Sequence, residues 1–307
     1  GCALNCVANG KIVKENIFDN VWIQPASGDA GGALGAALWA YYEVLGKERK
    51  IVTPDAQKGS LLGIEYSDEE SKRSLDKIGA KYRFINDEFG ELTPLIAKYI
   101  ADGKIIGHMN GRAEFGPRAL GNRSILADAR NTKMQRKLNL AVKKRESFRP
   151  FAPTCLEEDA PKYFAVKEGT TSPYMLLTMQ INDDIKLQPN KDDKDLFGIE
   201  KLNVVRSTVP AITHVDYSAR LQTVNRNTNM RYYSIIEEFK KLTGCSVIVN
   251  TSFNVRGEPL VNSPEDAYKC FMFTDIDILV VGKYVLLKEE QPPLAGYKEY
   301  LKTLRPD

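Results

Sequence analysis

The sequence has few of the residues on which metal-centred and disulfide-based proteins depend. It contains five Cys and two His among 307 residues, and no two Cys form a CxxC pair. An odd number of widely spaced Cys does not indicate a disulfide framework, and two His cannot supply a His-rich metal site. We therefore expect reduced, mostly buried cysteines and no His-rich metal centre built by this chain alone.

Long hydrophobic runs are also missing. No stretch approaches the ~20 apolar residues that cross a bilayer. The first residues do not show the basic region followed by an apolar stretch that is typical of a signal peptide. Hydrophobic residues make up 43% and charged residues 27% of the chain, which is typical of an ordinary globular protein with a sizeable core. We expect a cytoplasmic protein without a membrane partner. A pI of about 8.4 is too mild to indicate a nucleic-acid partner by itself.

Positive charge is concentrated between residues 112 and 149. This stretch holds seven Arg and four Lys against three acidic residues, whereas the whole chain has a net charge of only +3. Its first part carries Arg112, Arg118 and Arg123 between Gly and Pro residues, in turn-rich sequence. Planar guanidinium groups in such turns can converge on phosphate or carboxylate oxygens. The alternative is a solvated basic loop with surface ion pairs.

A second basic cluster follows, and two polar groups stand apart from it. The cluster consists of Lys143, Lys144, Arg145 and Arg149, and clusters of this kind are usually solvated. His214 stands near Asp216 and Arg220, a grouping that can orient a small polar substrate, although a lone His is more often a hydrogen-bonded core residue. The tripeptide of Ser252, Phe253 and Asn254 follows an expected strand. His108 has no comparable grouping of polar residues and is expected to have a structural role.

A Gly-rich turn precedes the first expected helix. Residues 25–32, PASGDAGG, follow a short expected strand and lead into a helix, an arrangement that directs backbone N–H groups toward a phosphate. Gly31 and Gly32 are therefore candidate phosphate ligands. Asp29 could hold a cation or a ribose hydroxyl, or it could cap the helix.

The expected strands and helices alternate without a strict βαβ order. Strands are expected at 21–24, 104–109, 124–127, 174–179, 211–215, 221–224, 246–249, 276–281 and 284–287. Helices are expected from Ala33, Ser67, Thr93, Asn131, about Ile235 and Ser263, and residues 182–203 look like a charged surface insertion. This mixture predicts an α+β fold with a sheet domain.

Four sequence blocks, in order, resemble the C-terminal part of the O-carbamoyltransferases of the NodU/CmcH/TobZ type. They are GRAEFGPRALGNRSILADAR, KKRESFRPFAP, HVDYSARLQTV and NTSFNVRGEPLV. The resemblance implies a YrdC-like twisted mixed sheet with flanking helices at 59–307. It also implies that residues 1–58 are the C-terminal remnant of an actin-like (ASKHA) domain.

The resemblance further implies a reaction and a set of ligands. Carbamoyl phosphate and ATP, with Mg²⁺, would give carbamoyl adenylate for transfer to a hydroxyl of a small molecule. Catalytic roles would fall to Arg118, Lys144 (or Lys143), Arg149 and His214. Nucleotide or substrate binding would fall to Arg112, Arg123, Lys143, Arg145, Arg220, Ser252, Asn254, Gly31 and Gly32.

In this family the residue matching Asp29 is a metal ligand, so a divalent metal such as iron is expected there in a full-length protein. Its His ligands would lie in a preceding half of the same protein. Two other functions stay open. One is a YrdC-like nucleotide- or RNA-binding module of tRNA threonylcarbamoyl-type modification, which the scarcity of aromatic residues in the basic stretch disfavours. The other is a non-catalytic domain.

Overall fold

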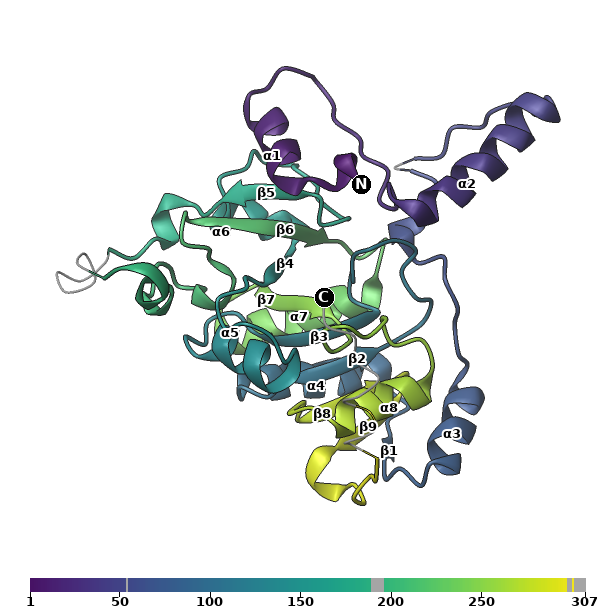
Figure 1. Ribbon diagram of the computed structural model, residues 1–307, viewed down its shortest axis with the longest axis vertical. Helices are drawn as coiled ribbons and strands as arrows, with labels where there is room; N and C mark the ends of the chain where they lie inside the picture. Colours follow the sequence, from purple (N-terminus) through teal and green to yellow (C-terminus); the bar gives the residue numbers. More distant parts are fainter. Residues whose placement is uncertain (54, 189–195, 297–299, 301–307) are drawn as a thin grey trace.

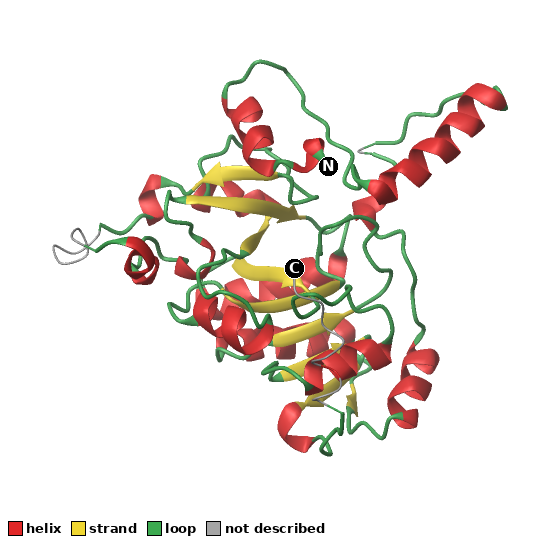
Figure 2. Ribbon diagram, viewed as in Figure 1, coloured by secondary structure: helices red, strands yellow, loops and turns green. Residues whose placement is uncertain are grey.

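One open sheet of nine strands organises the part of the chain that the structure describes. The computed structural model describes residues 1–53, 55–188, 196–296 and 300. The strands follow one another across the sheet in the order β1-β9-β8-β2-β3-β7-β4-β6-β5 (Figures 1 and 2). Their bounds are β1 Arg83–Phe84, β2 Ile106–Met109, β3 Arg123–Asp128, β4 Ala152–Leu156, β5 Leu177–Gln180, β6 Ser218–Val224, β7 Val247–Ser252, β8 Ile278–Val281 and β9 Tyr284–Leu287.

The sheet is mixed. Strand β2 is parallel to β8, and β4 is parallel to β6, whereas the other neighbouring pairs are antiparallel. Strands β3, β7 and β4 are central, and they are distant from one another in the sequence. This arrangement confirms the expected mixed α+β class. It also brings the end of β7 close to the residues that precede β4.

Helices cover both faces of the sheet. Helices α4 and α7 pack together against β2, β3, β4 and β7, and α8 lies on the other face, near β8 (Figure 1). The helix bounds are α1 Cys6–Lys14, α2 Asp29–Trp39, α3 Asp68–Lys77, α4 Thr93–Ala101, α5 Met134–Lys137, α6 Ala160–Tyr163, α7 Met230–Thr243 and α8 Pro264–Met272. Single π-helical turns at Ala40–Val44, Glu88–Leu92 and Leu138–Val142 extend α2, α4 and α5. No helix in the described residues is long and apolar enough to span a membrane.

Local sequence signals fix several helix ends. Ser67 and Glu70 form the expected capping box of α3, with the two reciprocal hydrogen bonds at 2.8 and 3.1 Å. Ser263 and its partner Asp266 form a second capping box at the start of α8. Gly244 ends α7 in the left-handed conformation, with φ of 75°, which glycine adopts without steric cost. These helix ends confirm the predictions.

Two expected strands are absent from the structure. Residues 211–215 do not form a strand, because Pro210–Ile212 is a 3-10 turn and Thr213 Oγ1 donates a hydrogen bond back to the carbonyl of Val209 at 3.0 Å. Strand β6 pairs instead with β4 and β5. Residues 21–24 are extended but pair with no strand in the described part of the chain. Of the charged surface insertion, residues 189–195 lie outside the described residues.

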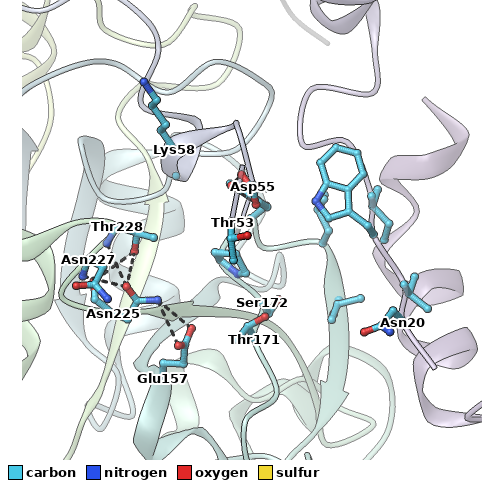
Figure 3. Close-up of a pocket in the computed structure, with 18 of the residues that line it drawn as sticks. Asn20, Thr53, Asp55, Lys58, Glu157, Thr171, Ser172, Asn225, Asn227 and Thr228 are labelled. Carbon is cyan, nitrogen blue, oxygen red and sulfur yellow. Dashed lines mark hydrogen bonds between the residues drawn. The ribbon is translucent and has the colours of Figure 1, made fainter. Parts of the chain in front are cut away.

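The N-terminal segment lies across the β5 edge of the sheet. Helix α1 packs on β5, where Asn9 Nδ2 donates to the carbonyl of Leu176 at 3.1 Å. A Cβ at Gly10 would lie 2.1 Å from the carbonyl oxygen of Thr178, so only glycine permits this approach. Helix α2 extends away from the sheet (Figure 1). Residues 20–23 form part of the wall of a cavity of about 780 Å³ (Figure 3).

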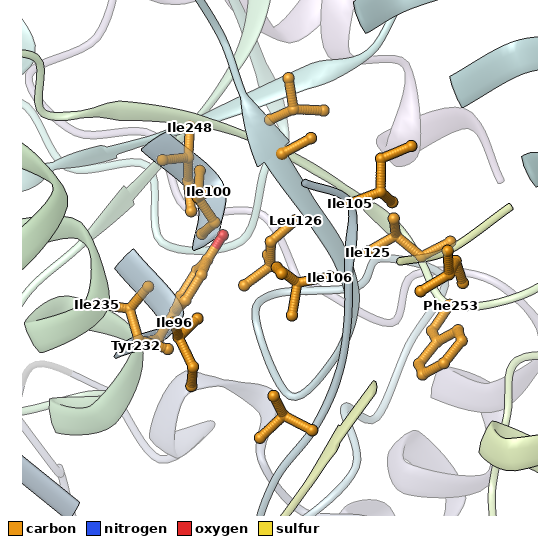
Figure 4. Packing of buried hydrophobic residues seen from close by; sticks show 14 of the residues in the cluster. Ile96, Ile100, Ile105, Ile106, Ile125, Leu126, Tyr232, Ile235, Ile248 and Phe253 are labelled. Carbon is orange, nitrogen blue, oxygen red and sulfur yellow. The ribbon is translucent and has the colours of Figure 1, made fainter. Parts of the chain in front are cut away.

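The hydrophobic core follows the alternation of side chains along the central strands. Successive residues Ile125 and Leu126 point to opposite sides of β3 (Figure 4). Ile125 lies on the side of Phe253, and Leu126 lies toward Tyr232 and Ile96 of α7 and α4. All of these side chains are fully buried. A central strand that is buried on both faces requires apolar residues at consecutive positions, as this sequence provides.

Candidate functional site

Lys143 lies at the centre of a polar cluster formed at the end of β7. Its Nζ contacts the carbonyl oxygen of Ser252 at 2.5 Å and Ser252 Oγ at 3.1 Å. It also contacts the carbonyl oxygen of Asn254 at 3.0 Å and Asn254 Oδ1 at 2.8 Å. Ser252 Oγ in turn donates to Asn254 Oδ1 at 2.7 Å. Lys143 and the Ser-x-Asn element, more than 100 residues apart in the sequence, therefore meet in the fold.

The Lys143 ammonium is held in an unusual environment. The side chain is only 3% exposed. Burial, assisted by the charge of Arg145, lowers the pKa of Lys143 to about 7, because an ammonium loses its hydration in the interior. The surrounding oxygens satisfy the N–H donors of the protonated form. A lysine with its pKa near neutrality, next to other cations, is typical of a functional site.

Arg145 lies over an aromatic ring beside Lys143. Its Nε donates to Asn139 Oδ1 at 2.7 Å, and its guanidinium lies 5.0 Å from the centre of the Phe151 ring. Asn139 Nδ2 also donates to the carbonyl oxygen of Arg149 at 2.8 Å. Burial and the nearby charge of Arg149 lower the pKa of Arg145 to about 10. The guanidinium is therefore fixed in place on the side that holds Nε, with its other nitrogens available to a ligand.

One acidic residue limits the charge of this cluster. Glu146 Oε2 forms an ion pair with Arg149 Nε at 3.0 Å, and Glu146 Oε1 accepts a hydrogen bond from Arg256 at 3.1 Å. The backbone N–H of Arg256 also donates a hydrogen bond to the carbonyl oxygen of Lys143 at 3.1 Å. The two arginines thus share one carboxylate, and the surrounding region keeps an excess of positive charge.

Arg118 and Arg220 form the second part of the cluster. Their Nε atoms are buried and have no hydrogen-bond partner among the described residues. Burial, followed by the charge of Arg118, lowers the pKa of Arg220 to about 10, and Arg145 adds to this effect. Like charges that are close together and partly desolvated are costly unless an anion compensates them. The charges of Arg118 and Arg145 therefore act on Arg220, and an anion bound beside them would offset their repulsion.

His214 lies at the edge of this region, before β6. Its pKa is lowered by burial and by the nearby Arg220, while Asp216 opposes this shift. Its Nδ1 lies 3.4 Å from Ser218 Oγ, and that hydroxyl donates to Asp216 Oδ1 at 2.7 Å. A neutral imidazole held in this way can donate or accept a hydrogen bond at its other nitrogen.

Glu114 shapes the Gly-rich loop that carries Arg118. Its Oε1 accepts from the backbone N–H groups of Leu120, Asn122 and Arg123 at 2.7, 2.9 and 3.3 Å. His108 is fully buried and contacts the carbonyl oxygen of Gly121 through Nδ1 at 2.7 Å. Burial lowers its pKa to about 4. His108 therefore has the structural role that was expected for it.

The side chains of three candidate residues do not join the Lys143 cluster. Arg123 is fully buried and donates to the carbonyl oxygens of Asn110, Gly111, Asn122 and Ile64 at 2.9 to 3.3 Å. Arg112 is exposed and contacts the Gly63 carbonyl at 3.2 Å and Glu65 at 3.6 Å. Lys144 is exposed and has a φ of 52°. In this structure Arg123 supports the loop, whereas neither Arg112 nor Lys144 joins the Lys143 cluster.

The glycine-rich turn lies at the start of α2. A Cβ at Gly31 would lie 2.1 Å from the carbonyl oxygen of Ala26, and Gly32 is exposed. Asp29 is the exposed first residue of α2, and Gly28, not Asp29, is the N-cap. Among the described residues, no three His, Cys, Asp or Glu side chains gather as metal ligands would. The described residues alone therefore do not fit a complete divalent-metal site.

Several partners of the cationic side chains are not evident from the sequence pattern. Asn139 orients Arg145, Phe151 lies beneath it, and Glu146 neutralises part of the charge. Arg256 falls within one of the four blocks, NTSFNVRGEPLV, so its place near the Ser-x-Asn element was a usable signal. Asn139 carried no such signal, because an amide in a helical stretch has many possible partners.

Comparisons with known proteins agree on the family. A family model described as Carbamoyltransferase C-terminus matches residues 97–288, and one described as Carbamoyltransferase N-terminus matches residues 1–38. The chain is 52% identical over 294 residues to protein sll1178 of Synechocystis sp., covering 95% of this chain and 47% of that protein. It is 41% identical to nodulation protein NolO of Bradyrhizobium diazoefficiens, covering 94% and 48%, respectively. Nodulation protein U of Sinorhizobium fredii is 37% identical, covering 84% and 39%.

The chain therefore spans about half the length of these relatives or less. A crystal structure of full-length HypF in the phosphate- and nucleotide-bound form aligns with a TM-score of 0.38 and 18% identity, over 66% of this chain and 22% of that one. That likeness is too low to support an argument. The matches to the family models cover strands β2 to β9 and residues 1–38, and they show that the chain belongs to the carbamoyltransferase family.

Proposed function

We propose that the cationic cluster binds carbamoyl phosphate and ATP and promotes formation of carbamoyl adenylate, for transfer of the carbamoyl group to a hydroxyl of a small molecule. The observation that carries this proposal is the meeting of Lys143, Ser252 and Asn254 beside the guanidinium of Arg145. Membership of the carbamoyltransferase family supports the reaction class. The resemblance to a YrdC-like domain supports the nucleotide.

The chemistry requires fixed positive charge. Carbamoyl phosphate, ATP and one water give carbamoyl adenylate, inorganic phosphate and pyrophosphate, so several anions must share one site. Arg118, Arg145 and Arg220 would offset the charge that develops as pyrophosphate leaves. Lys143 would turn one N–H donor from these oxygens to a phosphate oxygen, while Ser252 and Asn254 hold its other two donors. Mg²⁺ would accompany ATP and neutralise part of the phosphate charge.

The remaining assignments follow from position. His214, next to Arg220 and hydrogen-bonded through Nδ1, would orient the carbamoyl-bearing substrate. Arg149 would contribute charge from the edge of the cluster, where Glu146 holds it. The Gly31 and Gly32 turn and Asp29 would bind nucleotide and a divalent metal only together with ligands from a further part of a family-length protein.

Calorimetric titration of the 307-residue chain with ATP and with carbamoyl phosphate tests this proposal. We expect Arg118→Ala and Arg149→Ala to abolish measurable binding. Arg136 is exposed on α5 outside the cluster, so Arg136→Ala is the matched control and should leave the affinity unchanged. Unchanged affinity in the Arg118 and Arg149 variants would reject the site.

Two further measurements separate the alternatives. Conversion of ATP to AMP that depends on carbamoyl phosphate would exclude a non-catalytic domain. RNA binding that weakens steeply with added salt, without such turnover, would instead favour the tRNA-modification module.

A further inference from the structure

A cavity lies apart from the Lys143 cluster, where the N-terminal segment meets the β5 and β6 side of the sheet. Its volume is about 780 Å³, within the range of small-molecule sites. Residues from four separate stretches, at 20–23, at 52–53 with 55–59, at 171–177 and at 225–228, contribute to its wall together with Glu157. None of the candidate residues from the sequence lines it.

One wall of this cavity is rich in hydrogen-bonding groups. Asn225 Nδ2 lies 3.2 Å from Glu157 Oε1, and Asn225 Oδ1 accepts from the N–H groups of Asn227 and Thr228 at 3.0 and 3.1 Å. These four residues gather on one side of the cavity (Figure 3). The short turn at 225–228 is therefore rigid, and its polar side chains are presented in fixed positions. Fixed carboxylate and amide groups are suited to bind the hydroxyl or amino groups of a ligand.

The charge of the lining is the opposite of that of the Lys143 cluster. Asp55 and Glu157 are the carboxylates of the wall, and Lys58 is its one basic residue within the described part of the chain. Asp55 accepts from the hydroxyl of Tyr174 at 2.8 Å, which fixes its carboxylate in the wall. The Lys58 amine points away from the Glu157 and Asn225 side (Figure 3). An anionic ligand would therefore be repelled, and a neutral or cationic one would not.

Another part of the wall is apolar. Trp22 is 60% exposed although it lines the cavity, and Leu176, which also lines it, is 4% exposed. Ile23, Pro173 and Leu177 extend this surface. An accessible indole can pack against the flat C–H face of a ring compound while polar groups opposite bind its substituents.

We propose that this cavity binds a ring compound that carries several hydroxyl or amino groups and no negative charge. Identification of this ligand as the hydroxyl acceptor of carbamoyl transfer rests on the function proposed above. Binding to the cavity itself requires neither carbamoyl phosphate nor ATP. Failure of one proposal is thus distinguishable from failure of the other.

The chain contains two tryptophans, Trp22 and Trp39, which makes the test direct. In a Trp39→Phe variant, the fluorescence reports on Trp22 alone. We expect a saturable change on titration with methyl glucoside, which is neutral, and with glucosamine at slightly acidic pH, where it is cationic. Glucose 6-phosphate, which offers the same ring with a negative charge, should bind at least tenfold more weakly.

A pair of neighbouring glutamates supplies the matched variants in the Trp39→Phe background. Glu157→Gln should reduce the discrimination against glucose 6-phosphate at least threefold, whereas Glu158→Gln, at an exposed position outside the cavity, should leave it unchanged. Thermal unfolding checks that both variants fold. No fluorescence change with any of the three probes, equal binding of all three, or equal effects of the two substitutions would overturn the proposal.

Discussion

Replacement of Lys143 by methionine is the sharpest test of the anion site. Lys143→Met removes the ammonium from among the oxygens of Ser252 and Asn254 and roughly keeps the length of the side chain. A charge-assisted hydrogen bond from Lys143 to a bound phosphate contributes about 1.5–3 kcal/mol. We therefore expect the affinity for pyrophosphate to fall by about 10- to 150-fold. Lys144→Met, at the adjacent exposed position, should change it by less than about threefold.

The pH dependence of binding provides a second, independent readout. The pKa of Lys143 is lowered to about 7, so the free protein loses this proton as the pH rises through neutrality. A phosphate group that binds beside Lys143 favours the protonated amine and must take up a proton above that pH. The affinity of the unmodified chain should therefore decline by up to about tenfold per pH unit above pH 7.

Isothermal titration calorimetry with pyrophosphate at several pH values, in buffers of different ionisation enthalpy, measures both the affinity and the proton uptake. In Lys143→Met the proton uptake near pH 7 should disappear, whereas Lys144→Met should retain it. An affinity of the Lys143 variant equal to that of the unmodified chain would refute the reasoning. An equal loss of affinity for pyrophosphate in Lys144→Met would instead assign the phosphate contact to Lys144.

Two further predictions concern stability. A Cβ at Gly121 would lie 2.4 Å from the Tyr232 ring, at a φ of 121°, so Gly121→Ala should lower the free energy of unfolding by about 3 kcal/mol or more. Gly169→Ala, at a positive φ in open space, should cost only about 1 kcal/mol. Denaturant unfolding compares the two, and equal losses would contradict the packing argument. The stability of the unmodified chain should also rise with pH from about 7 to about 8.5, because burial lowers the pKa of Lys143 to about 7 and that of Lys288 to about 8, so the unfolded chain binds more protons there. Above about 8.5 the buried thiols of Cys155, Cys245 and Cys270 oppose this rise, because burial raises their pKa. Urea unfolding at a series of pH values should show a smaller rise in Lys143→Met, and an identical rise in the two proteins would exclude this linkage.

Much of the local structure was predictable because its causes are local. Both capping-box helix starts depend on residues three positions apart, as at Ser67 and Glu70. The hairpin of β8 and β9 around Gly282 follows from two apolar runs separated by a residue that accepts positive φ. In each case neighbouring residues supply the hydrogen bonds or the backbone conformation, so distant contacts were not needed for the prediction.

The two strand predictions that failed have different causes, one local and one distant in the sequence. Residues 211–215 are apolar and β-branched enough for a strand, yet Pro210 and the hydroxyl of Thr213 favour a turn. A strand also requires a neighbour with free hydrogen-bonding groups. Residues 21–24 have no such neighbour in the described part of the chain, whereas β6 pairs with both β4 and β5.

The sequence by itself determined where the positive charge is concentrated, the mixed α+β class, and the resemblance that pointed to the family. It could not distinguish among the basic residues. Arg123 and Lys143 both lie in the basic stretch. Arg123 donates hydrogen bonds to loop carbonyls, whereas Lys143 contacts Ser252 and Asn254. Only the tertiary structure decided this difference, because β7 lies between β3 and β4 and brings its end to Lys143. A side chain's role depends on the groups that surround it when it is buried, and those groups come from distant parts of the chain.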